Sequence, residues 1–576
     1  MQKENIGKII RKNTGKAPAD FLDTRKEYKI HNIWEGKQLL SKAINSGNYI
    51  YVMADYDVDG VTSGAIFETL FRAVGYTKYQ IRFPKRFSEG YGIKPETIDE
   101  IPKGGTPLLI TVDNGITSLT AIKKAKERGC QVLIVDHHRP LTQNGEMQLP
   151  DADIIIDPHV TGKCTFSHYC GAGLAYRLCS QFVKGDVKRQ MCGFAALGTI
   201  ADSMPLVEEN RQIVIEGLKA IVSKPYRTVG TRELLRAYNM DMYLTSSDVA
   251  YYIAPAINAM SRMYDDGAKL AFQTLVYNGK DDTAERMAQN MYDTNLCRKK
   301  LCRTCMDAII PYIENHNLDR WTPMCVYQAS IPEGIIGIIA GDLSQKYQRP
   351  VLVFSDSTED PGYYKGSARS YGGIDIHRLL SSCSRFLFKW GGHSDAAGLT
   401  ILPAALPELQ KGLADAYSHF GYRTCSTETE TKYDLSISLE ELPAVIKEID
   451  QFRPYGCGNP DIRLLIKDFR LEYKPYASGY SKKMGQDQEH IKFFGRDIDA
   501  IAYGMASKYE KIGEPLELGL ICTVDKNHYI SHKNGKLIIK DVLLCSDIFS
   551  AEKPAARTDM WAALERLANE KRIQKC

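Results

Sequence analysis

The stretch YIYVMADYDVDGVTSG, residues 49–64, decides how the rest of the chain is interpreted. An apolar, β-branched run ends there in three aspartates at alternate positions, Asp55, Asp57 and Asp59. The run predicts a buried strand. Carboxylates crowded at its end raise one another's pKa and oppose folding unless a cation lies between them. The rest of the chain must show what neutralises these charges.

The bulk composition predicts a multidomain globular protein. The chain has 576 residues, and about 100–200 residues per domain imply roughly three to five domains. A composition of 44% hydrophobic and 25% charged residues is ordinary for a soluble folded chain. The net charge of +4 permits a local basic groove for nucleic acid but does not indicate one.

The cysteines and the lengths of the apolar runs indicate the cellular compartment of the protein. Fifteen cysteines are scattered without a regular framework, which favours reduced thiols. Residues 1–16 have no apolar core of signal-peptide length, and no run approaches the ~20 apolar residues of a membrane span. We therefore expect a cytoplasmic protein that makes no contact with membranes. We also expect it to be a monomer.

Between residues 48 and 160, short apolar runs alternate with amphipathic stretches. The runs predict five strands, at residues 48–55, 79–85, 106–115, 130–138 and 152–159. The stretches 62–75 and 118–129 predict helices. This alternation predicts a parallel sheet covered on both faces, and the continuous apolar character predicts full burial.

Acidic residues fall where these strands end. The first, third, fourth and fifth strands end in Asp55, Asp113, Asp136 and Asp157, and His137 and His138 follow Asp136. In open α/β sheets the ligand crevice lies outside the carboxyl ends of the strands, so we expect these side chains to meet at one edge. Carboxylates suit Mn²⁺ or Mg²⁺, and imidazole shifts the preference toward Mn²⁺. A pair of such ions about 3.5–4 Å apart can activate water for displacement at phosphorus.

Divalent cations would therefore explain the crowded aspartates. The alternative for any single aspartate is a helix cap in a solvated loop. We assign Asp59 to such a capping or supporting role, and Asp157 to the turn before Pro158.

The remaining chain divides into helical, α/β and β-rich regions. Helices are predicted at 171–185, 187–206, 281–313 and 333–348, and a strand at 349–355. A Thr/Ser-rich linker covers 425–434, and short strands between 461 and 544 fit a small β-barrel. Residues 559–576 predict one short helix. The cysteines of CRKKLCRTC, residues 297–305, lack a second ligand pair, so we reject a metal site there.

Four motifs in this order resemble those of the DHH phosphoesterase family: ADYDVDG at 54–60, TVDNG at 111–115, VDHH at 135–138 and LGTIAD at 197–202. KGSARS at 365–370 and KWGGHSDAAG at 389–398 resemble its companion DHHA1 domain. Further stretches resemble the RecJ branch of that family, bacterial single-strand-specific 5′→3′ exonucleases: RFSEGYG at 86–92, INAMSRM at 257–263, IPEGIIGIIAGDL at 331–343 and FRPYGCGNP at 452–460. The resemblance covers roughly residues 48–546.

The resemblance implies a multidomain α/β fold. A parallel-sheet DHH domain would be joined by a long helix to a smaller α/β DHHA1-type domain, with a C-terminal oligonucleotide-binding (OB) β-barrel. The predicted segments are 1–45 (N-terminal), 46–225 (DHH, metal-binding), 226–318 (helical connector), 319–424 (DHHA1-type, phosphate-binding), 425–548 (OB-fold) and 549–576 (helical tail).

The resemblance also implies roles at the metal site. The expected ligands of two Mn²⁺ or Mg²⁺ ions are Asp55, Asp57, Asp113, His137 and Asp202, with Asp113 bridging both ions. Asp136 would orient the histidines, and His138 would face the scissile phosphate, so the catalytic set is Asp57, Asp113, Asp136, His137, His138 and Asp202. Some relatives carry a histidine four residues before the first aspartate. Here that residue is Tyr51, so we expect fewer protein ligands.

The same resemblance implies a phosphate-holding set. Arg86, Tyr91 and Arg262 would contact the 5′-terminal phosphate, although Ser261 stands where relatives often have glycine. Ser367 and Arg369, with Lys365, are expected on a Gly-containing turn, and Gly391, Gly392 and His393 on a loop close to a ligand. Candidates for stacking or charge on the barrel are Tyr476, Tyr480, Lys482, Lys483, Lys492, Phe493 and Phe494, each with a core or solvated-loop position as the alternative.

We therefore predict a metal-dependent 5′→3′ exonuclease of single-stranded DNA, acting in DNA repair and recombination. Single-stranded DNA is its expected partner, with a helicase or a single-strand-binding protein as further candidates. One alternative is a phosphodiesterase of short oligoribonucleotides or cyclic dinucleotides, against which the barrel and the long connector argue. Another is a non-catalytic DNA-binding replication factor, against which the intact set of ligand residues argues.

Overall fold

The computed structural model describes residues 2–23, 26, 28–90, 92–143, 145–422, 432–485, 487–530 and 537–551. These form two compact units. The larger unit comprises residues 26–204 and 208–427, and the smaller unit comprises residues 1–25, 205–207 and 428–576. The predicted tail helix at 559–576 and most of the predicted linker at 425–434 lie outside the described residues.

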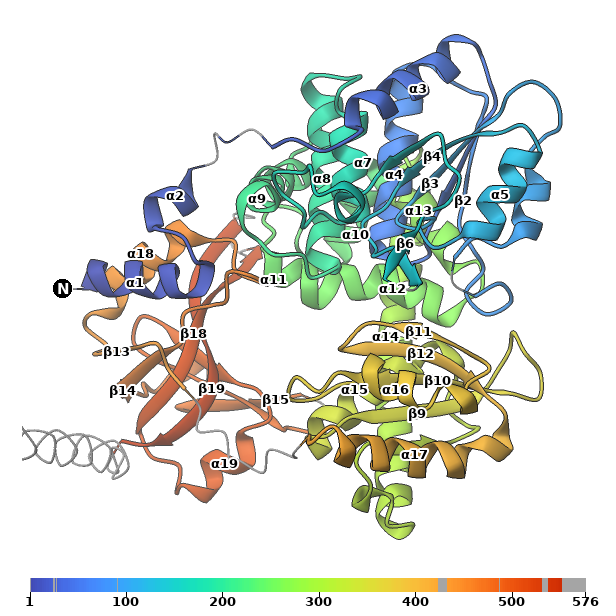
Figure 1. Cartoon of the computed structure of the whole chain (residues 1–576). Coiled ribbons are helices and arrows are strands. Elements are labelled where there is room, and N and C mark those ends of the chain that lie inside the picture. Colours follow the sequence, from blue (N-terminus) through green and yellow to red (C-terminus); the bar gives the residue numbers. More distant parts are fainter. Residues whose placement is uncertain are drawn as a thin grey trace, which may run out of the picture. The chain divides into compact units, whose positions relative to one another are not determined.

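A five-stranded parallel sheet organises the first part of the larger unit, as predicted. Its strands are β1 (Ile50–Ala54), β2 (Tyr79–Arg82), β3 (Leu108–Val112), β4 (Gln131–Val135) and β7 (Ile154–Ile156), in the order β2-β1-β3-β4-β7. Figure 1 labels β2, β3 and β4 of this sheet. Strands β1 and β3 are buried along their whole length, whereas the edge strand β2 is partly exposed. The strand order reverses between β1 and β3, so the carboxyl ends of these two strands flank the switch point where ligands bind in such sheets.

Helices cover this sheet and bring further residues to its carboxyl edge. The helices in contact with the sheet are α3 (Ile33–Asn45), α4 (Val58–Ala73), α5 (Leu119–Glu127) and α7 (Gly171–Cys179). Helix α8 (Gly185–Ala201) packs on α4 and α7, and α9 (Glu208–Val222) packs on α8. Helix α4 contacts β1, α7 and α8 (Figure 1). It begins at Val58, four residues before the predicted start at 62, because the Asp57 carboxylate accepts hydrogen bonds from the Asp59 and Gly60 amides and caps the helix.

A helical region follows, as predicted. Its main elements are α10 (Val229–Ala237), one π-helical turn η2 (Val249–Ile253), α12 (Ala254–Met263), α13 (Gly267–Val276) and the 35-residue α14 (Asp281–Asn315). Cys302 and Cys305 on α14 are buried among apolar side chains such as Ile309 and Ile339, and Cys297 is exposed. Within the described residues, the groups able to hold a metal ion do not include these cysteines.

The second α/β part of the larger unit is a sheet in the order β11-β12-β10-β9-β8. Its elements are β8 (Met324–Tyr327), α15 (Ile336–Tyr347), β9 (Val351–Asp356), β10 (Tyr364–Arg369), α16 (Ile376–Ser382), β11 (Lys389–Gly392), β12 (Ala396–Ile401) and α17 (Leu406–His419). The expectation of a turn at KGSARS is wrong, because these residues form the central strand β10. Gly366 and Ala368 face the core, where a Cβ on Gly366 would lie 2.5 Å from the Phe354 ring. The alternate residues Ser367 and Arg369 therefore point to the other face.

The smaller unit is built on one seven-stranded sheet. Its strands are β13 (Leu435–Ile437), β14 (Leu464–Arg470), β15 (Ser481–Met484), β16 (His490–Phe493), β17 (Asp499–Ala502), β18 (Glu517–Ile530) and β19 (Leu537–Ser550), in the order β13-β14-β18-β19-β17-β16-β15. Helices α1 (Gln2–Thr14) and α18 (Leu442–Ile449) contribute Ile6, Ile10 and Val445 to the same apolar core. Residues 2–23 thus fold with the smaller unit, whereas α3 belongs to the larger unit. The six segment boundaries inferred from the sequence stay predictions.

Two further findings concern packing and membranes. The segment Pro205–Val207 packs in the smaller unit, where the Leu206 amide donates to the Cys457 carbonyl at 2.7 Å. Cys457 belongs to the FRPYGCGNP stretch, and Gly458 of the same stretch approaches Pro205 closely. Among the helices that the structure describes, none combines the length and the apolar character needed to cross a bilayer.

Candidate metal centre and phosphate-binding site

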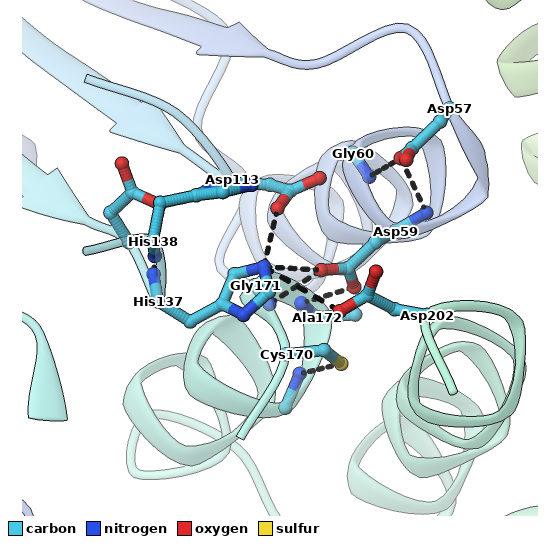
Figure 2. A network of polar contacts seen from close by, with 12 residues as sticks. Asp57, Asp59, Gly60, Asp113, His137, His138, Cys170, Gly171, Ala172 and Asp202 are labelled. Carbon is cyan, nitrogen blue, oxygen red and sulfur yellow. Dashed lines mark hydrogen bonds and ion pairs between the residues drawn. The ribbon is translucent and has the colours of Figure 1, made fainter. Parts of the chain in front are cut away.

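The carboxyl ends of the strands bring the predicted acidic residues and histidines together. The His137 Nε2 atom lies 3.0 Å from Asp113 Oδ1 and 3.7 Å from Asp202 Oδ2 (Figure 2). It also lies 3.7 Å from Asp59 Oδ2. One imidazole nitrogen is therefore surrounded by carboxylates from β3, from the end of α8 and from the first turn of α4.

The potential ligand atoms form three overlapping groups. They are Asp55, Asp57 and Asp113; Asp59, His137 and Asp202; and Asp113, His137 and His138. Within each group the ligand atoms lie within 4.8 Å of one another. Because Asp113 and His137 each belong to two groups, the arrangement is continuous and long enough for two neighbouring cations.

Burial makes this cluster costly without a cation. Asp55 and Asp113 are 3% and 2% exposed. Burial and the charges of neighbouring aspartates raise the pKa of Asp55, Asp57 and Asp113, and raise the pKa of Asp202 to about 8. Burial also lowers the pKa of His137, so this imidazole is a poor counter-charge for them.

The unsatisfied oxygens indicate what the cluster fits. Asp55 Oδ1 and Asp202 Oδ2 are buried and have no hydrogen-bond partner. A buried carboxylate oxygen without a partner is expensive, and coordination of a cation removes that cost. The donor set of carboxylates plus one or two imidazoles is the set that Mn²⁺ or Mg²⁺ accepts. The residues therefore fit a pair of divalent ions.

Asp136 is saturated by contacts within the protein. Its carboxylate accepts hydrogen bonds from the amides of Ile116 at 2.9 Å, His137 at 2.8 Å and His138 at 3.1 Å, and contacts His138 Nδ1 at 2.8 Å. Although burial raises the pKa of Asp136, these contacts hold it down to about 2. Burial lowers the pKa of His138, but the bond to Asp136 outweighs this and raises it to about 9. Asp136 thus fixes the orientation of the His138 ring.

The structure gives Asp59 a place that sequence reasoning missed. Its side chain accepts hydrogen bonds from the amides of Gly171 at 2.6 Å and Ala172 at 2.8 Å, at the start of α7 (Figure 2). It supports the site, as expected, and is also a member of one ligand group. Two glycines in the sequence mark this packing, because a side chain at either would clash with an aspartate. A Cβ on Gly198 would lie 2.6 Å from Asp59 Oδ1, and one on Gly171 would lie 2.6 Å from the Asp113 Cβ.

The structure also shows the surroundings of three other residues that the sequence analysis singled out: Asp113, Tyr51 and Asp157. Asp113 has φ of 59°, the left-handed region, which costs energy for a non-glycine residue and is typical of functional sites. Tyr51 is fully buried and donates to Glu100 Oε2 at 2.7 Å, away from the acidic cluster. Asp157 accepts from the His159 amide at 2.7 Å and caps α6 (Pro158–Thr161), in keeping with its turn assignment.

Three of the predicted arginines converge beside this cluster. The Arg86 guanidinium lies 4.7 Å from the centre of the Tyr56 ring, and the residue after Tyr56 is Asp57. Arg262 Nη1 donates to the Gly334 carbonyl at 3.3 Å, and Arg369 Nη1 donates to Ser367 Oγ at 3.1 Å. Burial, followed by the charges of Arg86, Arg298 and Arg369, lowers the pKa of Arg262 to about 9. Sequence reasoning missed the fourth arginine, Arg298 on α14.

The positive charges of these guanidinium groups are not balanced by nearby carboxylates. In the part of the chain that the structure describes, none of the four arginines has a carboxylate oxygen within the 4.0 Å of an ion pair. Cations gathered without carboxylates are characteristic of a site that binds a phosphate. Tyr91, the remaining residue predicted for this site, lies outside the described residues. Ser261 occupies an ordinary position in the helix α12, so the exchange for glycine does not alter the backbone there.

The GGH stretch also approaches the metal cluster. Gly392 ends β11 with φ of 149°, and a Cβ there would lie 2.4 Å from the Ala396 carbonyl oxygen, so only glycine fits. Burial, followed by the charges of His138 and Arg139, lowers the pKa of His393, so this imidazole lies close enough to His138 to feel its charge. A Cβ on Gly391 would meet nothing within 4 Å, which leaves open space beside the chain.

On the smaller unit only part of the predicted stacking set is available. Tyr476 is 78% exposed and Tyr480 is 39% exposed, but Phe493 and Phe494 are buried in the core and cannot stack on a base. Lys483 and Lys492 are paired with Glu510 and Asp499. Tyr473 and Tyr503, which are 53% and 52% exposed, lie on the same unit, and the sequence analysis did not identify them as candidates for stacking.

Comparison with known proteins assigns the family. Residues 49–199 match the DHH family N-terminal domain, residues 322–418 the DHHA1 domain and residues 433–541 the RecJ OB domain. The chain is 31% identical over 545 residues to the single-stranded-DNA-specific exonuclease RecJ of Salmonella typhimurium, covering 89% of this chain and 90% of that protein. This chain belongs to the RecJ family.

Other relatives agree. The RecJ of Bacillus subtilis is 30% identical over 538 residues, and the chain spans 64% of its length. The crystal structure of Thermus thermophilus RecJ with Mn²⁺ superposes with a TM-score of 0.74 at 25% identity, covering 95% of this chain and 76% of that one. A second structure, exonuclease RecJ bound to manganese, gives 0.58 at 28% identity over 68% of this chain and 96% of that one. The expected fold class and family resemblance are thus confirmed.

Proposed function

We propose that this RecJ-family protein is a metal-dependent exonuclease that degrades single-stranded DNA from its 5′ end. One observation carries the proposal. A buried cluster of carboxylates and imidazole lies in the same unit as a group of arginines that have no carboxylate partner. The first cluster fits divalent cations and the second fits a phosphate, which together are the needs of an enzyme that cuts phosphodiesters near a strand end.

The residues that would hold the ions follow from the ligand groups. Asp55, Asp57 and Asp113 would hold one ion. His137 and Asp202 would hold the other, with Asp113 shared and Asp59 close by. Divalent ions bound there would activate a water molecule and stabilise the charge that develops on the scissile phosphate. The related structures from crystals with Mn²⁺ support this choice of cation.

The chain's own residues would orient the strand. His138, held by Asp136 through its Nδ1 atom at 2.8 Å, would face the scissile phosphate. Arg86, Arg262 and Arg369 would bind the 5′-terminal phosphate with the help of Ser367. Because this anchor is fixed relative to the metal cluster, cleavage would occur one nucleotide from the bound end. Gly391, Gly392 and His393 would approach the backbone beside it.

The smaller unit would hold the strand further from the cut. Tyr476 and Tyr480 are exposed in a unit that matches the RecJ OB domain. Stacking of a base on such a ring contributes about 1–3 kcal/mol, and it does not depend on sequence. This unit would therefore raise affinity for long strands without changing the cleavage step.

We also propose a setting for the activity. The described cysteines are free thiols, which supports a cytoplasmic location. DNA repair and recombination are the processes that we infer, with the protein acting as a monomer and with a helicase or a single-strand-binding protein as partners. Light scattering of the purified chain, alone and with such partners, tests the monomer and the association.

The decisive experiment uses single strands labelled at the 5′ or the 3′ end. With Mn²⁺ the protein should release labelled mononucleotides from the 5′ end first, and EDTA should abolish the release. The Asp113→Ala variant should be inactive at every Mn²⁺ concentration. Full activity in EDTA, or an Asp113→Ala variant that cuts like the parent, would refute the proposal. A dinucleotide offered in parallel should be the poorer substrate.

A further inference from the structure

A cavity of about 250 Å³ lies between the metal cluster and the long helix α14. Ala201 and Ser203, on either side of Asp202, form one wall, and Arg262, Asn258 and Arg298 contribute polar groups. The other lining residues are mostly small or apolar, such as Ala254 and Ile338. This volume is below the roughly 300–1,000 Å³ of pockets that enclose drug-sized ligands, so it suits a phosphate group better than a whole nucleotide.

Arg298 is held in place by its own helix. Its Nε and Nη2 atoms donate to Asn295 Oδ1 at 3.2 and 3.0 Å. Asn295 is 1% exposed, and its Nδ2 atom donates to the Tyr238 hydroxyl at 3.1 Å. The guanidinium is therefore fixed by a neutral acceptor, which orients it without cancelling its charge. Side chains fixed in advance lose less entropy when they bind a ligand.

The charge of Arg298 has no carboxylate to compensate it. Asp342 on α15 feels this charge but lies beyond the 4.0 Å of an ion pair. Arg262 faces the same cavity and is likewise without a carboxylate partner among the described residues. Two arginine side chains that line one small cavity repel each other, and an anion between them would turn this repulsion into attraction.

The cavity shares only one of the three arginines assigned to the 5′ end. Arg86 and Arg369 do not line it, whereas Arg262 belongs to both groups. We propose that the Arg262–Arg298 cavity is a second phosphate-binding subsite, in which Arg298 contacts a phosphate group. The proposal rests on the proposed function in one respect: the phosphate would belong either to the 5′ end of a strand or to the released mononucleotide.

Direct binding measurements on the full chain in EDTA test the subsite without metal and without hydrolysis. The probes are inorganic phosphate, 5′-dTMP and thymidine, measured by calorimetry and thermal shift. Arg298→Gln should weaken phosphate and 5′-dTMP binding by about 10- to 100-fold, since a hydrogen bond to a charged group is lost, and should leave thymidine unchanged. Arg298→Lys keeps the charge but not the planar fork, and should fall between the parent and Arg298→Gln.

Lys300 provides the matched control. It lies two residues further along α14, is exposed, does not line the cavity and carries the same charge. Lys300→Gln should bind all probes like the parent. If Arg298→Gln and Arg298→Lys both bind phosphate and 5′-dTMP as well as Lys300→Gln does, the subsite does not exist.

Oligonucleotides with a 5′-phosphate or a 5′-hydroxyl separate the two sources of the phosphate. Weaker binding of Arg298→Gln to 5′-dTMP and to the 5′-phosphorylated strand, with unchanged binding to the 5′-hydroxyl strand, assigns the subsite to the strand end. Weaker binding to 5′-dTMP with unchanged strand binding assigns it to the product. The outcome is independent of the nuclease proposal: Arg298-dependent binding in a protein without nuclease activity would overturn only the proposed function, and active nuclease without such binding would overturn only the subsite.

Discussion

The contact at Gly198 allows the packing of the site to be tested by a single methyl group. In Gly198→Ala the new Cβ would lie 2.6 Å from Asp59 Oδ1, 2.7 Å from the Ala172 Cβ and 2.8 Å from Thr62 Oγ1. These atoms belong to the buried helices α4 and α7, so the methyl group fits only if a helix or the Asp59 carboxylate moves. Overpacking of this kind costs about 1–3 kcal/mol.

Gly193 on the same helix gives the matched control. A Cβ at that position would meet the Ile221 Cβ at 3.3 Å, a contact that small shifts can relieve. Both exchanges gain the higher helix propensity of alanine, about 1 kcal/mol. The difference between the two variants therefore isolates the overpacking, and Gly198→Ala should have a free energy of unfolding about 1–3 kcal/mol lower than Gly193→Ala.

Urea denaturation followed by circular dichroism in EDTA measures the stability difference, and calorimetry with Mn²⁺ measures the site. Because Asp59 supports the start of α7 and borders His137, its displacement should weaken Mn²⁺ binding or slow cleavage by about 10- to 100-fold. Gly193→Ala should bind Mn²⁺ and cut like the parent. The reasoning is refuted if Gly198→Ala matches Gly193→Ala in stability, Mn²⁺ affinity and rate.

Three further variants test separate parts of the account. Asp136→Asn should slow single-turnover cleavage by about 10- to 100-fold, because Asp136 orients His138 through the hydrogen bond at 2.8 Å. The number of bound Mn²⁺ ions should stay unchanged. Cleavage at the rate of the parent would contradict this role of Asp136. Arg369→Gln should reduce the preference for 5′-phosphorylated over 5′-hydroxyl strands by about 10- to 100-fold, measured as a ratio of initial rates, and a constant ratio would remove it from the 5′ site. Tyr476→Ala should weaken binding of long strands by about 5- to 150-fold in fluorescence anisotropy without a change in thermal stability, since the ring is 78% exposed. Equal affinity would exclude stacking on this residue.

The sequence predicts those parts of the site that depend on local patterns. Asp55 and Asp113 follow continuous apolar runs, and parallel strands bring their carboxyl ends to one edge whatever the connections between them. Arg86 and Arg262 followed from motifs that resemble those of RecJ, and in the structure Arg86 stacks on Tyr56, between Asp55 and Asp57, while Arg262 lies close enough to Arg86 to feel its charge.

The missed residues depend on contacts between distant parts of the chain. Asp59 looks like a helix cap locally, and its place beside His137 arises because α7, more than 100 residues later, docks its first amides on the carboxylate. Arg298 lies in a run of charged residues on α14 that reads as a solvated helix face. Its significance depends on Asn295 and on the cavity that α12 closes.

Backbone periodicity explains the error at KGSARS. Gly366 suggested a turn, but here glycine alternates with polar residues because the Phe354 ring leaves no room for a Cβ. A small residue at every second position of a strand and a glycine in a turn look alike in sequence.

Anomalous scattering from crystals grown with Mn²⁺ would show how many ions the acidic cluster binds and where they lie. We expect two ions about 3.5–4 Å apart, one beside Asp55 and Asp57, the other beside His137 and Asp202, with Asp113 in contact with both. A single ion, or a pair of ions that leaves Asp113 uncoordinated, would contradict this expectation.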